Sequence, residues 1–149
     1  MLEFLLREAV AGARLDDLVA VDSAGVSAEE VGNRADPRTL AVLERNGHAD
    51  WGGRAHRARR IGAHEIAERD LVLAADSGHL RRLERLAGGP SPRIRLIRSF
   101  DPDAVAAGTL DVDDPWYGGP ADFDRTYAEL RAALPGILAF VAGEAAAEN

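Results

Sequence analysis

The 149-residue chain contains no cysteine and, among its 18 basic residues, no lysine. The absence of cysteine excludes a disulfide framework and a thiolate zinc site. It also excludes any mechanism in which a cysteine of these 149 residues is the nucleophile. No apolar run approaches the roughly 18 residues of a membrane span, and the N-terminus lacks the basic and then apolar layout of a secretion signal. These absences predict a cytoplasmic protein with no membrane association.

What is present is typical of a globular domain. Hydrophobic residues make up 46% of the chain and charged residues 29%, and the length suits a single domain spanning residues 1–149. The formal net charge of −7 argues against a general nucleic-acid binder. No pair of histidines has a zinc-binding spacing, so we expect no metal and no other cofactor. The histidines are His48, His56, His64 and His79.

Hydrophobic periodicity predicts helices and strands in alternation. Helices are expected at residues 1–12, 37–47, 64–69, 78–86 and 121–141. Buried strands are expected at 18–22 and 70–76, and an outer strand at 93–100. This order predicts an α/β fold in three layers, with an open parallel sheet and helices on both faces. A doubly wound domain normally begins on a strand, whereas this chain begins on a helix.

The segment DVDDPWYGG at 111–119 is the most informative stretch. Asp114 precedes Pro115, which favours an extended backbone, and the glycines after it free the loop. Its carboxyl group is therefore displayed beside Trp116 and Tyr117, an arrangement that suits a general acid next to a flat ligand wall. The alternative is an Asp-Pro turn whose aromatic side chains pack on the last helix.

Polar side chains also follow two of the expected strands. Asp22 and Ser23 come after the strand at 18–22, and Asp76 ends the strand at 70–76. Ligands of open parallel sheets bind at the carboxyl ends of the strands, so these residues could support a site. A capping turn at Ser23 and a helix cap at Asp76 are the alternatives.

A basic cluster lies between residues 54 and 60 and contains no acidic residue. Its guanidinium groups could hold a phosphate. The alternative is a solvated helix start balanced by Glu65 and Glu68. The cluster consists of Arg54, His56, Arg57, Arg59 and Arg60.

Five short motifs together resemble the low-molecular-weight protein tyrosine phosphatase family, in its order and at its spacing. The resemblance extends from Met1 to about Phe140. The motifs are VDSAG at 21–25, VG followed by DPR at 31–38, HRAR at 56–59, DLVLAAD at 70–76, and DPWYGG at 114–119 with Phe123 and Tyr127 after it.

The resemblance implies a flavodoxin-like, phosphotyrosine phosphatase I-like fold and hydrolysis of phosphomonoesters, typically phosphotyrosine, without a metal. A cysteine thiolate would attack phosphorus, and an aspartate would protonate the departing phenol. On this mapping Asp114 is the general acid and base, and Trp116 and Tyr117 line the substrate entrance. Ser23, His56 and Asp76 match positions that brace the phosphate loop. The expected partner is a phosphorylated protein or a small phosphomonoester.

The sequence departs from the family pattern at its N-terminus. In the family, the first strand leads into a Cys-x-x-x-x-x-Arg loop, and the next helix begins like Met1 to Glu3 of this chain. The nucleophile and the phosphate-binding arginine are therefore absent, and the 149-residue chain is expected to be inactive. The missing strand would lie between those at 18–22 and 70–76, so the first central strand of the sheet is missing. We expect a misplaced gene start and a natural product with about 15 to 20 further residues, one strand and one loop.

A second departure concerns specificity. The family often has an aromatic residue before the VG motif, whereas this chain has Glu29 and Glu30, an anionic wall that should disfavour phosphorylated peptides. Two alternatives to a phosphatase stay open. One is an arsenate reductase on the same fold, which would need a cysteine relay, and the other is a non-catalytic relative that binds a phosphoprotein.

Overall fold

The computed structural model describes residues 1–48 and 55–147. Within these ranges two short strands pair in parallel, β1 (Val72–Ala74) and β2 (Ile94–Leu96). Val72 lies opposite Ile94, and its N–H donates to the carbonyl of Arg93 at 2.8 Å. The N–H and C=O groups of successive residues in a strand point to opposite edges of that strand. Those of Val72 point toward β2, and those of Leu73 therefore point away from it.

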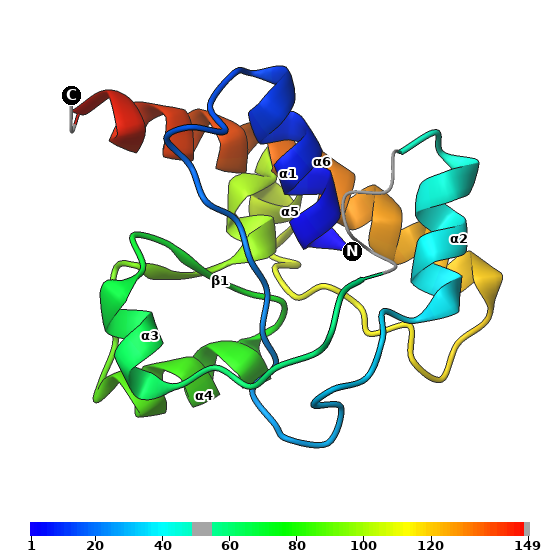
Figure 1. The fold of residues 1–149 in the computed structure, drawn as a ribbon, viewed down its shortest axis with the longest axis horizontal. Helices are drawn as coiled ribbons and strands as arrows, with labels where there is room; N and C mark the ends of the chain where they lie inside the picture. The colour runs from blue at the N-terminus through cyan, green and yellow to red at the C-terminus, as the bar shows by residue number, and fades with distance from the viewer. Residues whose placement is uncertain (49–54, 148–149) are drawn as a thin grey trace.

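Helices surround this pair of strands (Figure 1). In chain order they are α1 (Leu2–Gly12), α2 (Pro37–Arg45), α3 (Ala63–Glu68), α4 (Ser77–Ala87), the 3-10 helix η1 (Ile97–Phe100), α5 (Pro102–Ala107) and α6 (Pro120–Ala147). The Asp36 side chain caps α2 by accepting the Arg38 N–H at 2.8 Å, with Pro37 in the first turn. Gly88 ends α4 with φ of 85°, a conformation that glycine adopts without strain.

The apolar side chains of β1 serve two separate clusters. Val72 and Ala74 belong to the cluster formed with Ile66 of α3 and Leu83 of α4. Leu73 instead packs on the cluster formed by α1, η1 and α6. Successive side chains of a strand point to opposite faces, so helices cover both faces of the sheet. The predicted α/β class is confirmed, with a smaller sheet than expected.

The expected strand at 18–22 does not form, and this prediction was wrong. Residues 19–24 have no regular secondary structure, although Val19 and Val21 pack on the cluster of α1 and α6. Their backbone groups find partners outside a sheet. The Val19 N–H donates to the Leu15 carbonyl at 2.8 Å, and Arg7 Nε donates to the Val21 carbonyl at 3.0 Å. The reason is that a strand needs a neighbour, and no described strand lies beside this segment.

The prediction for residues 93–100 was right only in part. The strand ends at Leu96, and the chain then turns into η1. Helix α5 follows and was missed, because a loop was expected there. Its start carries the same signal as α2, since the Asp101 side chain accepts the Asp103 N–H at 3.1 Å and Pro102 occupies the first turn.

Helix α6 is the longest element and lies across the core. It extends to Ala147, six residues past the predicted end, and its far end leaves the body of the domain (Figure 1). Gly136 allows close contact with η1, because a Cβ there would collide with the Phe100 carbonyl oxygen. By length and composition alone α6 could span a membrane. Its buried residues, among them Leu130 and Ile137, are however part of the core.

Candidate active site

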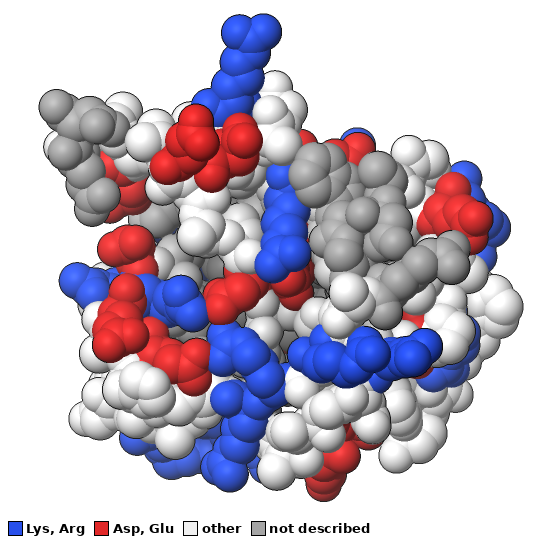
Figure 2. Space-filling view, in the orientation of Figure 1, with Lys and Arg blue, Asp and Glu red and all other residues white. Residues whose placement is uncertain are grey.

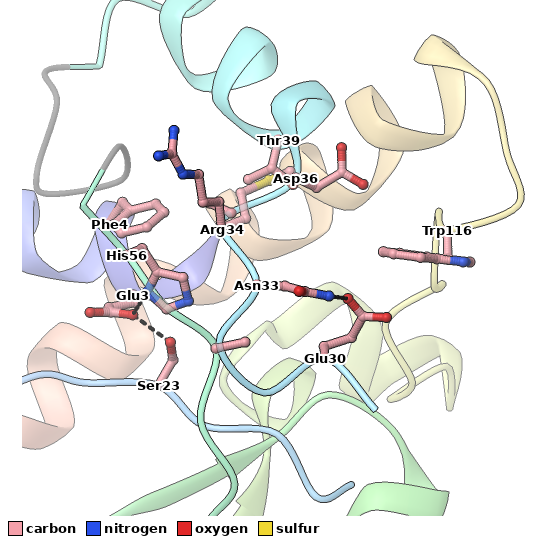
Figure 3. A pocket seen from close by; sticks show the side chains of 13 residues that line it. Glu3, Phe4, Ser23, Glu30, Asn33, Arg34, Asp36, Thr39, His56 and Trp116 are labelled. Carbon is pink, nitrogen blue, oxygen red and sulfur yellow. Dashed lines mark hydrogen bonds and ion pairs between the residues drawn. The ribbon is translucent and has the colours of Figure 1, made fainter. Parts of the chain in front are cut away.

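A pocket of about 230 Å³ opens at the start of α1. It brings together segments that lie far apart in the chain, and Figure 3 shows their side chains around it. Four residues predicted from the sequence line it, namely Ser23, Glu30, His56 and Trp116. The remaining lining residues are Met1, Glu3, Phe4, Asn33, Arg34, Ala35, Asp36, Thr39 and Ala58.

Glu3 links the two predicted supporting residues on one side of the pocket. The Ser23 hydroxyl donates to Glu3 Oε2, and His56 Nδ1 lies 3.5 Å from the same oxygen (Figure 3). The Glu3 side chain is only 7% exposed, so these partners replace water around a buried carboxylate. Ser23 and His56, which both match positions that brace the phosphate loop, therefore lie beside the same carboxylate, and the sequence reading did not single out that residue.

The surroundings of Glu3 complete this buried network. Arg7 Nη2 pairs with Glu3 Oε1 at 2.7 Å, one helical turn along α1. The ring of Phe4 packs edge-on against His56, with 5.7 Å between the ring centroids. Burial lowers the pKa of the Met1 ammonium, while the Glu3 charge acts in the opposite direction. This side of the pocket is thus polar and well supplied with hydrogen-bonding groups around the buried Glu3 carboxylate.

Trp116 lies on the opposite side of the pocket (Figure 3), whereas Asp114 is outside the residues that line it. Trp116 faces the pocket with 45% of its surface exposed, whereas Tyr117 is 98% exposed and lies outside the lining. Asp114 Oδ1 accepts the Trp116 N–H at 2.9 Å, which leaves the rest of this exposed carboxylate open to a ligand. At that exposure Tyr117 does not pack on the last helix, as the alternative for this residue supposed.

Arg38 joins this segment to α2. Its Nη1 donates to the carbonyls of Trp116 at 3.1 Å and Gly118 at 3.5 Å. Its Nη2 and Nε donate to Asp36, at 2.7 and 3.1 Å. The pKa of Asp36 is held below its usual range, chiefly by these hydrogen bonds from Arg38.

The glutamates before the VG motif differ from each other. Glu30 lines the pocket and accepts a hydrogen bond from Asn33 Nδ2 at 2.7 Å, while Glu29 is exposed and outside the lining. Arg34 also lines the pocket, so its entrance carries both signs of charge. The surface around the pocket also carries both signs of charge. Figure 2 shows arginine side chains across the middle and lower edge of this face, with acidic side chains beside them. The negative net charge is therefore unevenly distributed.

Asp76 and the described arginines of the basic cluster, Arg57, Arg59 and Arg60, lie outside the pocket lining. Asp76 caps α4 by accepting the His79 N–H at 2.7 Å, which matches the helix-cap alternative. Arg59 forms ion pairs with Asp22 at 2.7 Å and with Glu65 at 2.5 Å. These pairs match the alternative in which acidic side chains balance the basic cluster, and not a phosphate site. Arg54 lies outside the described residues. The described residues contain no group of three or more side chains suited to a metal ion.

The sequence reading missed Glu3 and Arg38. Glu3 has the spacing of an ordinary polar residue in an amphipathic helix. The repeat of apolar residues along the helix does not indicate that the face with Glu3 lines a pocket. Arg38 stands in the DPR motif, where it reads as part of a helix start. Its long-range contacts depend on where the segment 114–118 lies, which only the fold determines.

An α/β domain with helices on both faces of a parallel sheet, and a pocket at the start of its first helix, belongs to the flavodoxin-like class. A sequence model described as low molecular weight phosphotyrosine protein phosphatase matches residues 1–147. The chain therefore belongs to the low molecular weight protein tyrosine phosphatase family, and the predicted resemblance is confirmed.

Relatives of known name agree with this assignment. The chain is 46% identical over 145 residues to the low molecular weight protein-tyrosine-phosphatase of Streptomyces coelicolor, a match that covers 95% of this chain and 84% of the relative. It is 41% identical over 123 residues to the low molecular weight protein-tyrosine phosphatase A of Mycobacterium tuberculosis, covering 83% and 71%.

Solved structures share the fold. YfkJ from Bacillus subtilis superposes with a TM-score of 0.84 at 24% identity, over 96% of this chain and 86% of that one. A protein tyrosine phosphatase from Entamoeba histolytica, with Hepes in its active site, gives a TM-score of 0.82 at 22% identity, over 96% and 88%. At such identities the likeness concerns the fold alone.

Proposed function

We propose that these 149 residues carry the acid-bearing and substrate-facing part of a phosphomonoester hydrolase site that acts on phosphorylated proteins. The observation that supports this most is the pocket itself. It sets Trp116 opposite the Glu3, Ser23 and His56 network, and Asp114 stands two residues before that tryptophan. A flat aromatic wall beside a displayed carboxyl group suits a phosphorylated phenol.

In the reaction that family membership implies, a thiolate sulphur bonds to phosphorus as the phosphorus–oxygen bond to the phenol breaks. Asp114 would give its proton to the departing phenolate oxygen. The same carboxylate would then take a proton from the water that cleaves the sulphur–phosphorus bond, which restores the thiolate and releases phosphate. Glu3, Ser23 and His56 would hold the phosphate-binding loop from below, and Trp116 would stack on the substrate ring.

The thiolate is not among these 149 residues, so we propose that the chain by itself does not turn over phosphomonoesters. A segment outside these residues would supply the thiolate and the phosphate-binding amides. The edge of β1 at Leu73, beside which no other described strand lies, supports a place for one more parallel strand. A strand in that place would give the outward-facing backbone groups of Leu73 hydrogen-bonding partners.

Turnover of p-nitrophenyl phosphate tests the proposal. The 149-residue chain is compared with a chimera in which a family member's first strand and Cys-x5-Arg loop precede Met1. We expect no turnover by the chain alone, turnover by the chimera, and slower turnover by the chimera with Asp114→Asn. A folded chimera with an intact loop and no turnover would refute the assignment of the pocket.

The second candidate is a non-catalytic protein that binds phosphorylated partners, in the cytoplasm as the sequence predicts. The absence of cysteine favours it. Calorimetric titration of the 149-residue chain with a phosphotyrosine peptide and its unphosphorylated form distinguishes the two. Phosphate-dependent binding by the chain alone would favour the binding protein, because a catalytic site without its loop lacks the groups that hold the phosphoryl oxygens.

A further inference from the structure

All three guanidinium nitrogens of Arg38 donate hydrogen bonds, and one of them reaches a segment that is distant in the sequence. Two of them bind the Asp36 carboxylate, which itself caps α2. The third donates to the carbonyls of Trp116 and Gly118, 78 and 80 residues further along the chain. Because the guanidinium is planar and its donors are fixed in a fork, the bond to Asp36 also fixes the direction of the nitrogen that reaches the carbonyls.

The Arg38 guanidinium also lies against the aromatic rings of Phe123 and Trp116. Its central carbon is 4.5 Å from the centroid of Phe123 in the first turn of α6 and 5.8 Å from that of Trp116. Both distances are within the range of a cation–π contact. Arg38 is therefore held by α2 on one side and by α6 on the other, with the Trp116 ring beside it.

The segment that carries Asp114 and Trp116 is attached at its start by other residues. The Asp113 N–H donates to Glu129 Oε2 at 3.2 Å, and the Asp113 carbonyl accepts from Thr126 at 3.0 Å. From Asp114 to Gly118, the described hydrogen bonds that come from other elements are those of Arg38. The remaining ones, such as that from the Gly118 N–H to the Pro115 carbonyl at 2.8 Å, lie within the segment.

We propose that Arg38 is a positioning residue for the segment that carries Asp114, and that it holds the Trp116 ring as a wall of the pocket. Only the naming of Asp114 as the acid rests on the proposed function. Without the guanidinium, this segment has no described hydrogen-bond partner in α2. Gly118 and Gly119 at its end give the backbone the freedom to change conformation. The Trp116 ring would then spend more time in solvent.

The fluorescence of Trp116 tests this directly. The chain has two tryptophans, so a Trp51→Phe background leaves Trp116 as the only one. In that background we expect Arg38→Met to raise the acrylamide quenching constant about twofold, because the fork to the two carbonyls is lost. Arg38→Lys keeps the charge without the fork and should restore the parent value only in part.

Arg95→Met is the matched control. Arg95 also lies over two rings, 4.0 Å from the Phe100 centroid and 5.3 Å from that of Phe140, but away from the segment 114–118. Its loss should leave the quenching of Trp116 unchanged. A merely structural role for Arg38 would alter stability without this local signal.

A second variant guards against an Arg38→Met protein that does not fold. Asp36→Asn keeps a side chain that can cap α2 and removes the charge that orients Arg38. It should raise the quenching constant to a value between those of the parent and Arg38→Met. Unchanged quenching in folded Arg38→Met, or in Asp36→Asn if the first variant does not fold, would overturn the proposal. Since no turnover is measured, this result does not depend on whether the domain hydrolyses phosphate esters.

Discussion

The hydroxyl of Ser23 donates a hydrogen bond to the carboxylate of Glu3, which joins the loop after residue 22 to the first turn of α1. Glu3 is one of few buried charged residues in the described structure. A buried carboxylate is tolerated when donors surround it, and here those donors also bring two predicted site residues together. The floor of the pocket is therefore part of what stabilises α1.

Removal of the Ser23 hydroxyl should accordingly destabilise the domain. We expect Ser23→Ala to lower the free energy of unfolding by about 1 kcal/mol, because a buried carboxylate loses a donor. Urea denaturation followed by circular dichroism measures this. Ser27→Ala is the control, since the Ser27 side chain has no hydrogen bond within the described residues, and it should change the stability little. Equal stability of the two variants would contradict the role given to Ser23.

The contact between α6 and η1 makes a second prediction. A Cβ at Gly136 would collide with the Phe100 carbonyl oxygen, so Gly136→Ala should destabilise the domain by about 1 to 3 kcal/mol. Gly143 lies in the same helix, and a Cβ there meets nothing within 4 Å. Gly143→Ala should therefore stabilise the protein by about 0.5 to 1 kcal/mol through helix propensity. Thermal unfolding of both variants checks the opposite signs.

Helix positions could be predicted from the sequence because their signals are local. The Asp36–Pro37 pair and the Asp76 cap mark the starts of α2 and α4, and both helices form where expected. The same Asp-Pro signal at Asp101 was overlooked, because the run before it alternates like a strand and a loop was expected after it. The segment at 18–22 shows the limit of this approach, since a strand exists only if another strand lies beside it.

Half of the predicted site residues line the pocket, but the sequence did not predict how they meet. Ser23 and His56 were expected to act together and do meet, but the carboxylate that joins them is Glu3. Asp76 was placed with them by the family pattern, and its described contacts are those of a cap. Nearness in space depends on the whole fold, which no local pattern encodes.

The pair formed by Asp36 and Arg38 predicts a dependence on pH. Hydrogen bonding from Arg38 lowers the pKa of Asp36 in the folded protein, so the unfolded chain binds more protons as the pH falls. The stability from this pair is therefore present above the unfolded-state pKa and is lost as the pH falls through the folded-state pKa.

Comparison of the parent with Asp36→Asn measures this contribution. The difference between their unfolding free energies should be largest near about pH 6 and shrink below about pH 4, where the unfolded carboxyl becomes protonated. A difference that stays constant from about pH 6 to about pH 3 would show that the charge of Asp36 contributes nothing.

Asp114 should matter for chemistry and not for folding. Its carboxylate is exposed, and its described hydrogen bond is to the Trp116 N–H, which an asparagine oxygen can also accept. We therefore expect Asp114→Asn to change the unfolding free energy by less than about 0.5 kcal/mol. A large loss of stability would instead mark Asp114 as part of the structural turn.

The most direct test of Asp114 as the proton donor is the dependence of turnover on the leaving group. In the chimera that carries the Cys-x5-Arg loop, kcat is measured for aryl phosphates whose phenols have pKa values from about 7 to about 10, with and without Asp114→Asn. The account predicts that the loss caused by the substitution grows as the phenol becomes more basic, because a poorer leaving group needs the proton more. The same loss for every phenol would contradict it.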